Sequence, residues 1–370
     1  EFPRDKACGD GLTPRAVLEL QRLGLRDWLD AHIRHHGLRL SGFGSSVEVP
    51  WPGPSFPGWG SAVPRTELDD RIRKVAEDSG AAMLLGIKAV DVDRDTAGRV
   101  SAVVLADGSR VRCGSLIVAD GARSTFGRAL GRQWHQETVY GVAARGYLAS
   151  PRADEPWISS DLELRSPAGG VLPGYGWIFP LGNGEVNIGV GALATAKRPA
   201  DVALRPLIKH YTDLKRSSWG FEGPPRAVSS ALLPMGGAVS GVAGPNWVLI
   251  GDAAACVNPL NGEGIDYGLE TGRLAASMVG APDLTAAWPA LLADHYARGF
   301  SVARRLGLLL TLPRFLPLTG PVAMRSRRLM GLAVRVMGNL VTDEDADWVA
   351  RVWRSAGYGS RILDRRKPFN

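Results

Sequence analysis

Two apolar runs of the chain each end at a glycine and an aspartate. The first run, residues 247–250, is Trp-Val-Leu-Ile and leads into Gly251 and Asp252. A short apolar run bounded by turn residues predicts a buried strand. Four later residues mark a turn and the start of a helix: Pro259, Gly262, Gly264 and Ile265. The free N–H groups at that helix start would face the end of the strand, which suits a phosphate or a ribityl chain.

The second run, residues 116–119, leads into Asp120 and Gly121, and Arg123 and Arg128 follow in the next loop. Either motif alone is also typical of an ordinary strand-to-helix turn. Asp252 can accept hydrogen bonds from sugar hydroxyls, and glycines after it allow a ligand to approach the backbone closely. The order and spacing of the two motifs together favour a ligand site over two unrelated turns.

The rest of the pattern alternates helical and strand-like segments, which predicts an α/β fold with two domains. Residues 13–29 and 65–76 have the periodicity of helices, and Thr66 is a candidate cap for the second. Strand-like alternation dominates residues 139–190 and returns near residues 227–233. After Gly272 the chain is expected to be mainly helical, with an irregular tail from Arg361 to Lys367.

Composition indicates a globular protein with material for two packed domains. The chain has 370 residues, of which 45% are hydrophobic and 22% are charged. Its three cysteines and six scattered histidines form neither a disulfide framework nor a metal-binding pattern, so no metal is expected. A reducing cytoplasm is the expected compartment.

The net charge of +7 is concentrated near the C-terminus. Residues 296–342 contain no acidic residue and carry eight arginines: Arg298, Arg304, Arg305, Arg314, Arg325, Arg327, Arg328 and Arg335. Interleaved leucines make a basic amphipathic segment that would lie peripherally on the cell membrane. Prolines and Arg314 interrupt every apolar run, which excludes a spanning helix. Core helices with an arginine-rich solvent face are the alternative, and no nucleic-acid reader module accompanies the arginines.

Two further segments indicate a family. Residues 6–11 are Lys-Ala-Cys-Gly-Asp-Gly, and residues 173–180 are Pro-Gly-Tyr-Gly-Trp-Ile-Phe-Pro, followed by Asn-Ile-Gly-Val-Gly at 187–191. With the two strand ends, these segments resemble the geranylgeranyl reductase family of FAD-dependent oxidoreductases, which shares its fold with flavoprotein hydroxylases. The resemblance covers essentially the whole chain. It is closest to the members that reduce an isoprene unit of the menaquinone tail.

The resemblance implies FAD as cofactor, a prenyl-lipid or quinone substrate, and an electron donor that the sequence does not identify. It makes Cys8 the candidate catalytic residue beside the flavin, although a small residue that lets the flavin pack closely is the alternative. Arg65 matches the family's arginine that meets the flavin nucleotide. The implied cofactor-binding residues are Cys8, Gly9, Asp10, Gly11, Arg65, Val90, Asp120, Gly121, Gly251, Asp252, Pro259, Gly262, Gly264 and Ile265. The implied substrate-binding residues are Tyr175, Trp177, Phe179, Pro180, Gly189 and Gly191.

The aromatic segment has a physical use of its own. Tyr175, Trp177 and Phe179 alternate, so they lie on one face of a strand, and a polyprenyl chain needs a long apolar trough. A sheet core built from aromatic residues is the alternative interpretation.

The resemblance also implies the domain organisation. We expect a first part of an FAD-binding domain (1–135), an inserted antiparallel β-sheet substrate domain (136–235), a second part of the FAD domain (236–282) and a helical C-terminal region (283–370). The family pattern opens with a Gly-x-Gly-x-x-Gly βαβ unit, which this sequence lacks, so the FAD domain is expected to be truncated at its N-terminus. Two other functions therefore stay open: an aromatic or quinone monooxygenase of the same fold, and a non-catalytic chain that binds prenyl lipids.

Overall fold

The computed structural model describes residues 2–200 and 202–370. In it the two apolar runs form neighbouring parallel strands, β8 (Leu116–Val118) and β17 (Trp247–Leu249). The short strand β16 (Ala243–Gly244) pairs with the other side of β17. Because β8 and β17 are parallel, the two Asp/Gly motifs follow their carboxyl ends at one edge of this sheet. The 3₁₀ turn η1 (Gly251–Ala254) comes directly after β17.

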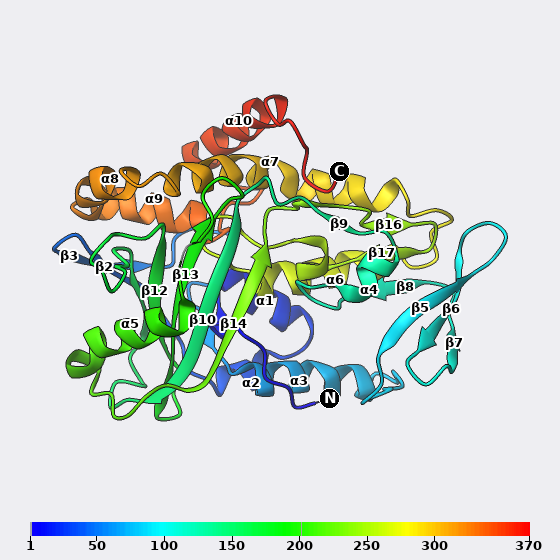
Figure 1. Cartoon of the computed structure of the whole chain (residues 1–370), viewed down its shortest axis with the longest axis horizontal. Coiled ribbons are helices and arrows are strands. Elements are labelled where there is room, and N and C mark those ends of the chain that lie inside the picture. The colour runs from blue at the N-terminus through cyan, green and yellow to red at the C-terminus, as the bar shows by residue number, and fades with distance from the viewer. Residues whose placement is uncertain (1, 201) are drawn as a thin grey trace.

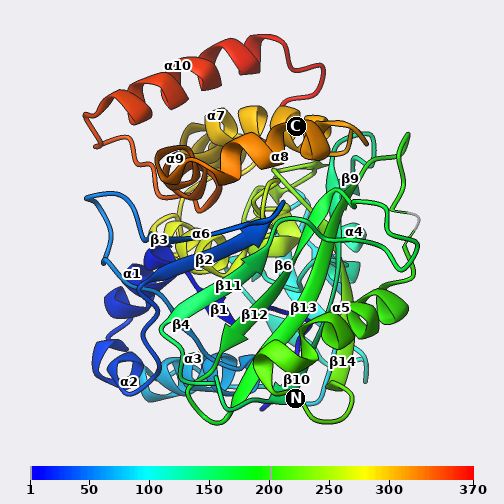
Figure 2. The same ribbon diagram turned by 90° about the vertical axis from the view of Figure 1, so that its left-hand side faces the viewer.

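A seven-stranded sheet lies between the C-terminal helices and helix α5 (Figure 2). Its strands, in spatial order, are β14 (Arg226–Pro234), β10 (Tyr140–Ala149), β13 (Glu185–Ala194), β12 (Gly174–Pro180), β11 (Trp157–Asp161), β2 (Gly37–Gly42) and β3 (Ser45–Pro50). Neighbours are antiparallel except β11 and β2, which are parallel. The strands expected within residues 139–190 and 227–233 all belong to this sheet. Strands β2 and β3 join it from the region before residue 135, so the sheet crosses the expected domain boundary.

Helix α5 (Leu204–Trp219) covers one face of this sheet with apolar side chains, including Leu207, Ile208 and Tyr211. The smaller elements are the pairs β1 (Gly11–Leu12) with β4 (Ser61–Ala62) and β9 (Gln133–Trp134) with β15 (Val239–Ser240), and the short helix α4 (Thr125–Ala129). A meander of β5 (Ala89–Arg94), β6 (Val100–Leu105) and β7 (Arg110–Arg112) projects at the right of Figure 1. Strand β5 begins six residues later than the strand expected from residue 83.

The helix expected over residues 13–29 is two helices. Thr13 caps α1 (Pro14–Arg22), its Oγ1 accepting a hydrogen bond from the N–H of Ala16 at 3.4 Å. Gly24 has a φ of +76°, which turns the chain before α2 (Arg26–Asp30). Helix α3 (Arg65–Asp78) begins where it was expected, but Thr66 is not its cap, because Pro64 occupies that position without a side-chain hydrogen bond.

The C-terminal region is helical, as expected. Its helices are α6 (Ile265–Ser277), α7 (Ala287–Leu310), α8 (Phe315–Met324), α9 (Arg327–Met337) and α10 (Trp348–Ile362). Helix α7 runs along the top of the molecule in Figure 1, with α10 above it and α8 and α9 at its left end. Trp288 of α7 is fully buried and donates its Nε1–H to the carbonyl of Leu249 in β17 at 2.9 Å, which ties this layer to the parallel sheet.

The arginine-rich segment is not one continuous surface. Arg304 is 6% exposed and Arg335 is 8% exposed, and Arg335 pairs with Asp345 and Asp347. The expectation of a single basic face from Arg298 to Arg335 is therefore wrong for these two side chains. Four arginines around α8 and the start of α9 are exposed: Arg314, Arg325, Arg327 and Arg328.

No single helix in residues 2–200 and 202–370 is long and apolar enough to cross a membrane. Helices α7 and α8 pass the test of length and composition only as a pair, and a bend of 108° separates them. Residues 363–367 follow α10 with no helix or strand, as expected of the tail. Beyond them, the Phe369 side chain is 3% exposed in the core, and the N–H of Phe369 donates to the carbonyl of Gly237 at 2.8 Å.

Candidate cofactor and substrate site

A cavity of about 510 Å³ lies where the parallel sheet, the loop of residues 6–11 and strand β12 meet. Most of the predicted site residues line it together: Cys8, Gly9, Asp10, Gly11, Arg65, Gly121, Tyr175, Trp177, Phe179, Gly191, Gly251, Asp252, Gly262, Gly264 and Ile265. Parts of the chain that are more than 200 residues apart in sequence thus form one wall.

The other five predicted residues are not in the lining: Val90, Asp120, Pro180, Gly189 and Pro259. Asp120 accepts hydrogen bonds from Ser124 Oγ at 2.6 Å and from the N–H of Phe126 at 2.9 Å. Its carboxylate is therefore hydrogen-bonded to the start of α4. Val90 is 48% exposed on β5, and Pro259 lines a second cavity. Gly189 does not line the cavity but lies against the Trp177 ring, which does.

The corner after β17 has the backbone that its glycines predict. Gly251 has a φ of +54°, in the left-handed region that favours glycine. A Cβ added to Gly264 would lie 3.2 Å from Asp252 Oδ1, so a side chain there would crowd the carboxylate. Lys6 Nζ pairs with Asp252 Oδ2 at 3.0 Å, which joins the loop of residues 6–11 to this corner. The N-terminus of α6 lies at the same end of the cavity and favours negative charge there.

Two glycines bring the loop of residues 6–11 against the aromatic strand. A Cβ on Gly9 would lie 3.0 Å from the Phe179 ring, and a Cβ on Gly11 would lie 2.9 Å from it. Real Cβ atoms essentially never come closer, so larger residues at either position would push the loop off β12. Cys8 stands next to Gly9 and is therefore held beside this contact, in the lining of the cavity.

Asn187 connects that loop to the aromatic wall. Its Nδ2 donates to the carbonyl of Cys8 and to Asp10 Oδ2, both at 2.9 Å. Its Oδ1 accepts from Trp177 Nε1 at 2.9 Å. Because Asn187 is fully buried, all three bonds form away from water, and together they fix Cys8 relative to the Trp177 ring.

The aromatic residues of β12 form the expected row. The ring centroids of Tyr175 and Trp177 are 5.8 Å apart, and those of Trp177 and Phe179 are 6.1 Å apart. A Cβ on Gly189 of the neighbouring strand would lie 2.1 Å from the Trp177 ring, so this glycine makes the space that Trp177 fills. The Tyr175 hydroxyl donates to the carbonyl of Asn261 at 2.5 Å, which links the row to the corner before α6.

Beyond the aromatic row the cavity is lined almost entirely by apolar side chains. They come from β2, from β14 and the residue after it, and from helices α7 to α9, and include Leu38, Leu40, Leu233, Met235, Leu310, Leu316, Met330, Val334 and Met337. A glycine-rich polar end and a long apolar end therefore share one cavity. This is the arrangement that a cofactor and an apolar chain would need to meet.

Comparison with known proteins agrees with this geometry. The chain is 76% identical to the menaquinone reductase of Mycolicibacterium smegmatis over 373 residues, which cover 100% of this chain and 91% of that protein. It is 74% identical to the menaquinone reductase of Mycobacterium tuberculosis, with 100% and 90% covered. The chain belongs to the menaquinone reductase family. A digeranylgeranylglycerophospholipid reductase of Methanopyrus kandleri is a more distant relative, 30% identical over 74% of this chain and 70% of that protein. No protein-family model matches the chain.

Solved structures show that the menaquinone reductase fold is shared with flavin enzymes. A geranylgeranyl bacteriochlorophyll reductase-like protein of Thermoplasma acidophilum superposes with a TM-score of 0.73 at 17% identity, covering 96% of this chain and 90% of that one. The flavin-dependent brominase Bmp2 gives a TM-score of 0.70 at 19% identity, covering 98% and 92%. At such identities the likeness concerns the fold alone, which is the α/β flavoprotein fold that the sequence predicted.

Burial controls the ionisable groups of the loop of residues 6–11. It raises the pKa of the Cys8 thiol, and the nearby Arg65 guanidinium offsets only part of that rise, so the group is a thiol near neutral pH. Burial also raises the pKa of Asp10 to about 6, against the hydrogen bonds from Tyr147 and Asn187. Asp10 Oδ1 has no hydrogen-bond partner among the described residues.

The sequence reasoning missed three residues that shape this site: Arg145, Asn187 and Glu263. Arg145 on β10 is 1% exposed and binds the carbonyl of Lys6, and Asn187 is described above. Arg145 is the one charged residue of β10, and Asn187 is followed in β13 by apolar residues and glycines only, a signal that could have marked both as buried partners of another segment. Glu263 sits between two predicted cofactor-binding glycines and lines the cavity.

Proposed function

We propose that the protein is an FAD-dependent reductase that saturates a C=C bond of a polyprenyl chain, in the isoprenoid tail of menaquinone. The observation that carries the proposal is the single cavity in which a glycine-rich corner and an aromatic and aliphatic trough meet. Membership of the menaquinone reductase family supports the same substrate class.

The lining fits a flavin. Seven glycines allow close approach of the backbone: Gly9, Gly11, Gly121, Gly251, Gly262, Gly264 and Gly268. Asp252 would accept hydrogen bonds from ribityl hydroxyls, Arg65 would supply positive charge, and the N-terminus of α6 would favour the negative charge of a phosphate or a reduced ring. When bound, a reduced flavin supplies a hydride to an alkene carbon.

The protein's own residues position the alkene and exclude water. An unactivated C=C bond carries no charge to bind, so its orientation must come from apolar packing. Trp177 is 6% exposed, donates a hydrogen bond to Asn187 and packs against Gly189, which fixes this side of the trough. Aliphatic residues of α8 and α9 close the far end.

The experiment that tests this function measures the tail itself. FAD-loaded protein, reduced with dithionite without oxygen, is expected to add two hydrogen atoms to the tail of menaquinol, as read by mass spectrometry. A menaquinol with a saturated tail is the control and should leave the flavin reduced. Insertion of oxygen when air is admitted would indicate a monooxygenase instead. Absence of both products would favour a non-catalytic lipid-binding chain.

The outer surface of α8 and α9 supports a further part of the proposal, contact with an anionic membrane. Leu318 is 71% exposed, Val322 is 65% exposed and Leu329 is 48% exposed. The exposed arginines Arg314, Arg325, Arg327 and Arg328 flank them. The inner sides of the same helices line the cavity through Leu316, Met330 and Ala333. A tail drawn from the bilayer would therefore pass only this helical layer.

Vesicle binding tests the membrane contact. Changing Arg325, Arg327 and Arg328 together to glutamate should weaken binding to anionic vesicles by about 100-fold, because each basic residue near such a surface contributes about 1 kcal/mol. Binding of the unchanged protein should fall as salt rises, since the attraction is screened within a Debye length. Sedimentation with vesicles measures both effects.

A charge-matched control carries the same three reversals away from this surface, at the exposed Arg26, Lys88 and Arg112. It should bind vesicles nearly as well as the unchanged protein. Equal losses in the two triple variants would mean that net charge alone matters and that α8 and α9 are an ordinary solvated face.

A further inference from the structure

One face of α6 and of the turn before it carries three carboxyl groups, of which two are buried and the first is half-buried at the cavity. Glu263, Asp266 and Glu270 are separated by three and then four residues, the spacing that places side chains on the same side of a helix. Seven residues of helix span roughly 10 Å. This row leads from the cavity described above toward a second, more polar cavity of about 340 Å³.

Glu263 stands at the first end of the row. It lines the first cavity, and its Oε1 accepts a hydrogen bond from the N–H of Ile265 at 3.2 Å. Burial and the charge of Asp266 raise the pKa of Glu263 well above its ordinary value, against the backbone N–H groups that lower it. Tyr175 and Cys8 face the same part of the cavity, and the Lys6–Asp252 ion pair lies beside it.

Asp266 is the second member and is fully buried. Its Oδ2 accepts from Asn339 Nδ2 at 3.2 Å, and its Oδ1 accepts from the N–H of Tyr267 at 2.7 Å. Burial raises the pKa of Asp266 to about 6, and the charge of Arg15 limits that rise. The charge of Asp266 disfavours a negative charge on Glu263, so Glu263 keeps its proton to a higher pH than an exposed glutamate does.

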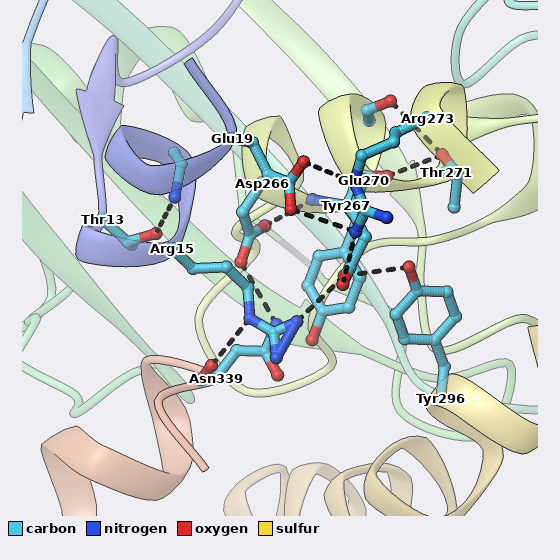
Figure 3. Close-up of polar contacts among 12 residues, drawn as sticks. Thr13, Arg15, Glu19, Asp266, Tyr267, Glu270, Thr271, Arg273, Tyr296 and Asn339 are labelled. Atoms are coloured by element: carbon cyan, nitrogen blue, oxygen red, sulfur yellow. Dashed lines mark hydrogen bonds and ion pairs between the residues drawn. The ribbon is translucent and has the colours of Figure 1, made fainter. Parts of the chain in front are cut away.

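The second cavity meets the row at its other end. Arg15 Nη1 pairs with Glu270 Oε2 at 2.9 Å, and the Tyr296 hydroxyl donates to the same oxygen at 3.0 Å. Figure 3 shows these side chains converging beside Asp266 from α1, α6 and α7. Arg15 and Asn339 both line the second cavity and both act on Asp266. A single side chain, that of Asn339, therefore connects Asp266 with the second cavity.

We propose that Glu263 supplies the proton that reduction of the alkene consumes, and that Asp266 restores it from the second cavity. This inference rests on the proposed function. The π bond of the alkene breaks, and one carbon gains a hydride from the reduced flavin, which is oxidised by two electrons. The other carbon gains the proton of Glu263, whose O–H bond breaks to leave a carboxylate. Asp266 then returns a proton to that carboxylate.

Cys8 and Asp10 also line the cavity and are less suited to this role. Each turnover consumes one proton, so the donor must be refilled. Asp10 is fully buried, and its Oδ2 accepts hydrogen bonds from Tyr147 and Asn187. Neither of these two residues lines the second cavity, so they give Asp10 no path to it. Cys8 contacts no member of the α6 row through a hydrogen bond among the described residues. Glu263 lines the first cavity and stands three residues before Asp266, on which Arg15 and Asn339 of the second cavity act.

The first test uses Glu263→Gln, which keeps the size and the acceptor for Ile265 but carries no acidic proton. Flavin affinity and the rate of reduction by dithionite are measured in the same variant, and the transfer to the alkene is compared at full flavin occupancy. Oxidation of the reduced flavin by menaquinol with an unsaturated tail should slow by about 100-fold or more, the usual contribution of a general acid. Asp266→Asn removes a negative charge beside Glu263 and so lowers the pKa of Glu263. Glu263 then loses its proton at a lower pH, and the single-turnover rate of this variant should fall at a lower pH than that of the unchanged protein.

The second test needs neither flavin nor substrate. A carboxyl group whose folded pKa is raised contributes stability that is present below its ordinary pKa of 4.5 and is lost as pH rises through the folded pKa. The melting temperature of Glu263→Gln relative to the unchanged protein should therefore rise as pH rises above 4.5. Glu222→Gln, at an exposed position, is the control and should show no such trend.

The outcomes separate the inference from the function beneath it. Unchanged single-turnover rates in Glu263→Gln, or a melting difference that does not depend on pH, would overturn the role of Glu263 while leaving the reductase in place. If the unchanged protein adds no hydrogen to the tail, the proposed function is wrong. An alkene carbon is then not the acceptor of the Glu263 proton either.

Discussion

Replacing Trp177 by alanine is expected to lower the free energy of unfolding by about 3–5 kcal/mol and to abolish reduction of the prenyl tail. Trp177 is 6% exposed, and its ring lies between Tyr175 and Phe179. The change opens a void in front of Gly189, whose missing side chain leaves room for this ring. It also leaves Asn187 Oδ1 without its donor, so the link to the loop of residues 6–11 weakens.

Trp219→Ala is the matched control. Trp219 is the last residue of α5, is 4% exposed and packs on Phe221, away from the cavity. Its loss should cost similar stability, measured by urea unfolding, yet leave tail reduction intact below the melting transition. FAD affinity, measured by titration of flavin absorbance, should survive in both variants. Loss of flavin binding in Trp177→Ala ahead of tail reduction would place the aromatic row in the structural core and not in a substrate trough.

Local chemistry made much of the cofactor corner predictable. The strand before Gly251, the start of α6 at Ile265 and the alternation of the aromatic residues in β12 depend on nearest neighbours in sequence, and all three occur as expected. The helix over residues 13–29 was misjudged for an equally local reason. Gly24 adopts a positive φ and ends α1, whereas the apolar periodicity continues through it.

Tertiary contacts decided what the sequence could not show. Arg304 and Arg335 look identical to Arg327 and Arg328 in a basic segment, but burial depends on which face of each helix meets the sheet. Arg335 is buried because Asp345 and Asp347, from the segment before α10, reach its guanidinium. No periodicity within residues 296–342 specifies that partner. The expectations for a truncated FAD domain and for its boundaries stay predictions.

Long-range pairing also explains why Asn187 and Arg145 escaped notice. A polar residue in an apolar strand signals a buried hydrogen bond, but it does not identify the other partner. Here the partner is the loop of residues 6–11, more than 130 positions away. The same loop carries Cys8, so the two missed residues hold the very segment that sequence comparison selected as functional.

Arg145→Ala is expected to destabilise the protein by roughly 3–6 kcal/mol, because two hydrogen bonds from a buried charged donor contribute about 1.5–3 kcal/mol each. Its guanidinium donates to the carbonyl of Ala227 at 2.6 Å and to that of Lys6 at 2.8 Å, and it also pairs with Asp5. The side chain is 2% exposed, so water cannot replace these bonds. Urea unfolding measures the loss.

Arg226→Ala separates this effect from a general loss of positive charge near Tyr147. Both guanidinium groups lie over that ring, at 4.8 Å for Arg145 and 4.9 Å for Arg226. The Arg226 side chain is 57% exposed, and its ion pair among the described residues is with Glu185 at the surface, so its removal should cost no more than about 1 kcal/mol. Arg145→Ala should in addition raise the pKa of Asp10 further, since the Arg145 charge lowers it. Equal destabilisation in the two variants would show that stacking on Tyr147, and not the bond to the loop of residues 6–11, is what Arg145 contributes. In that case the loop that presents Cys8 must be held by Asn187 and by the contact of Gly9 and Gly11 with Phe179.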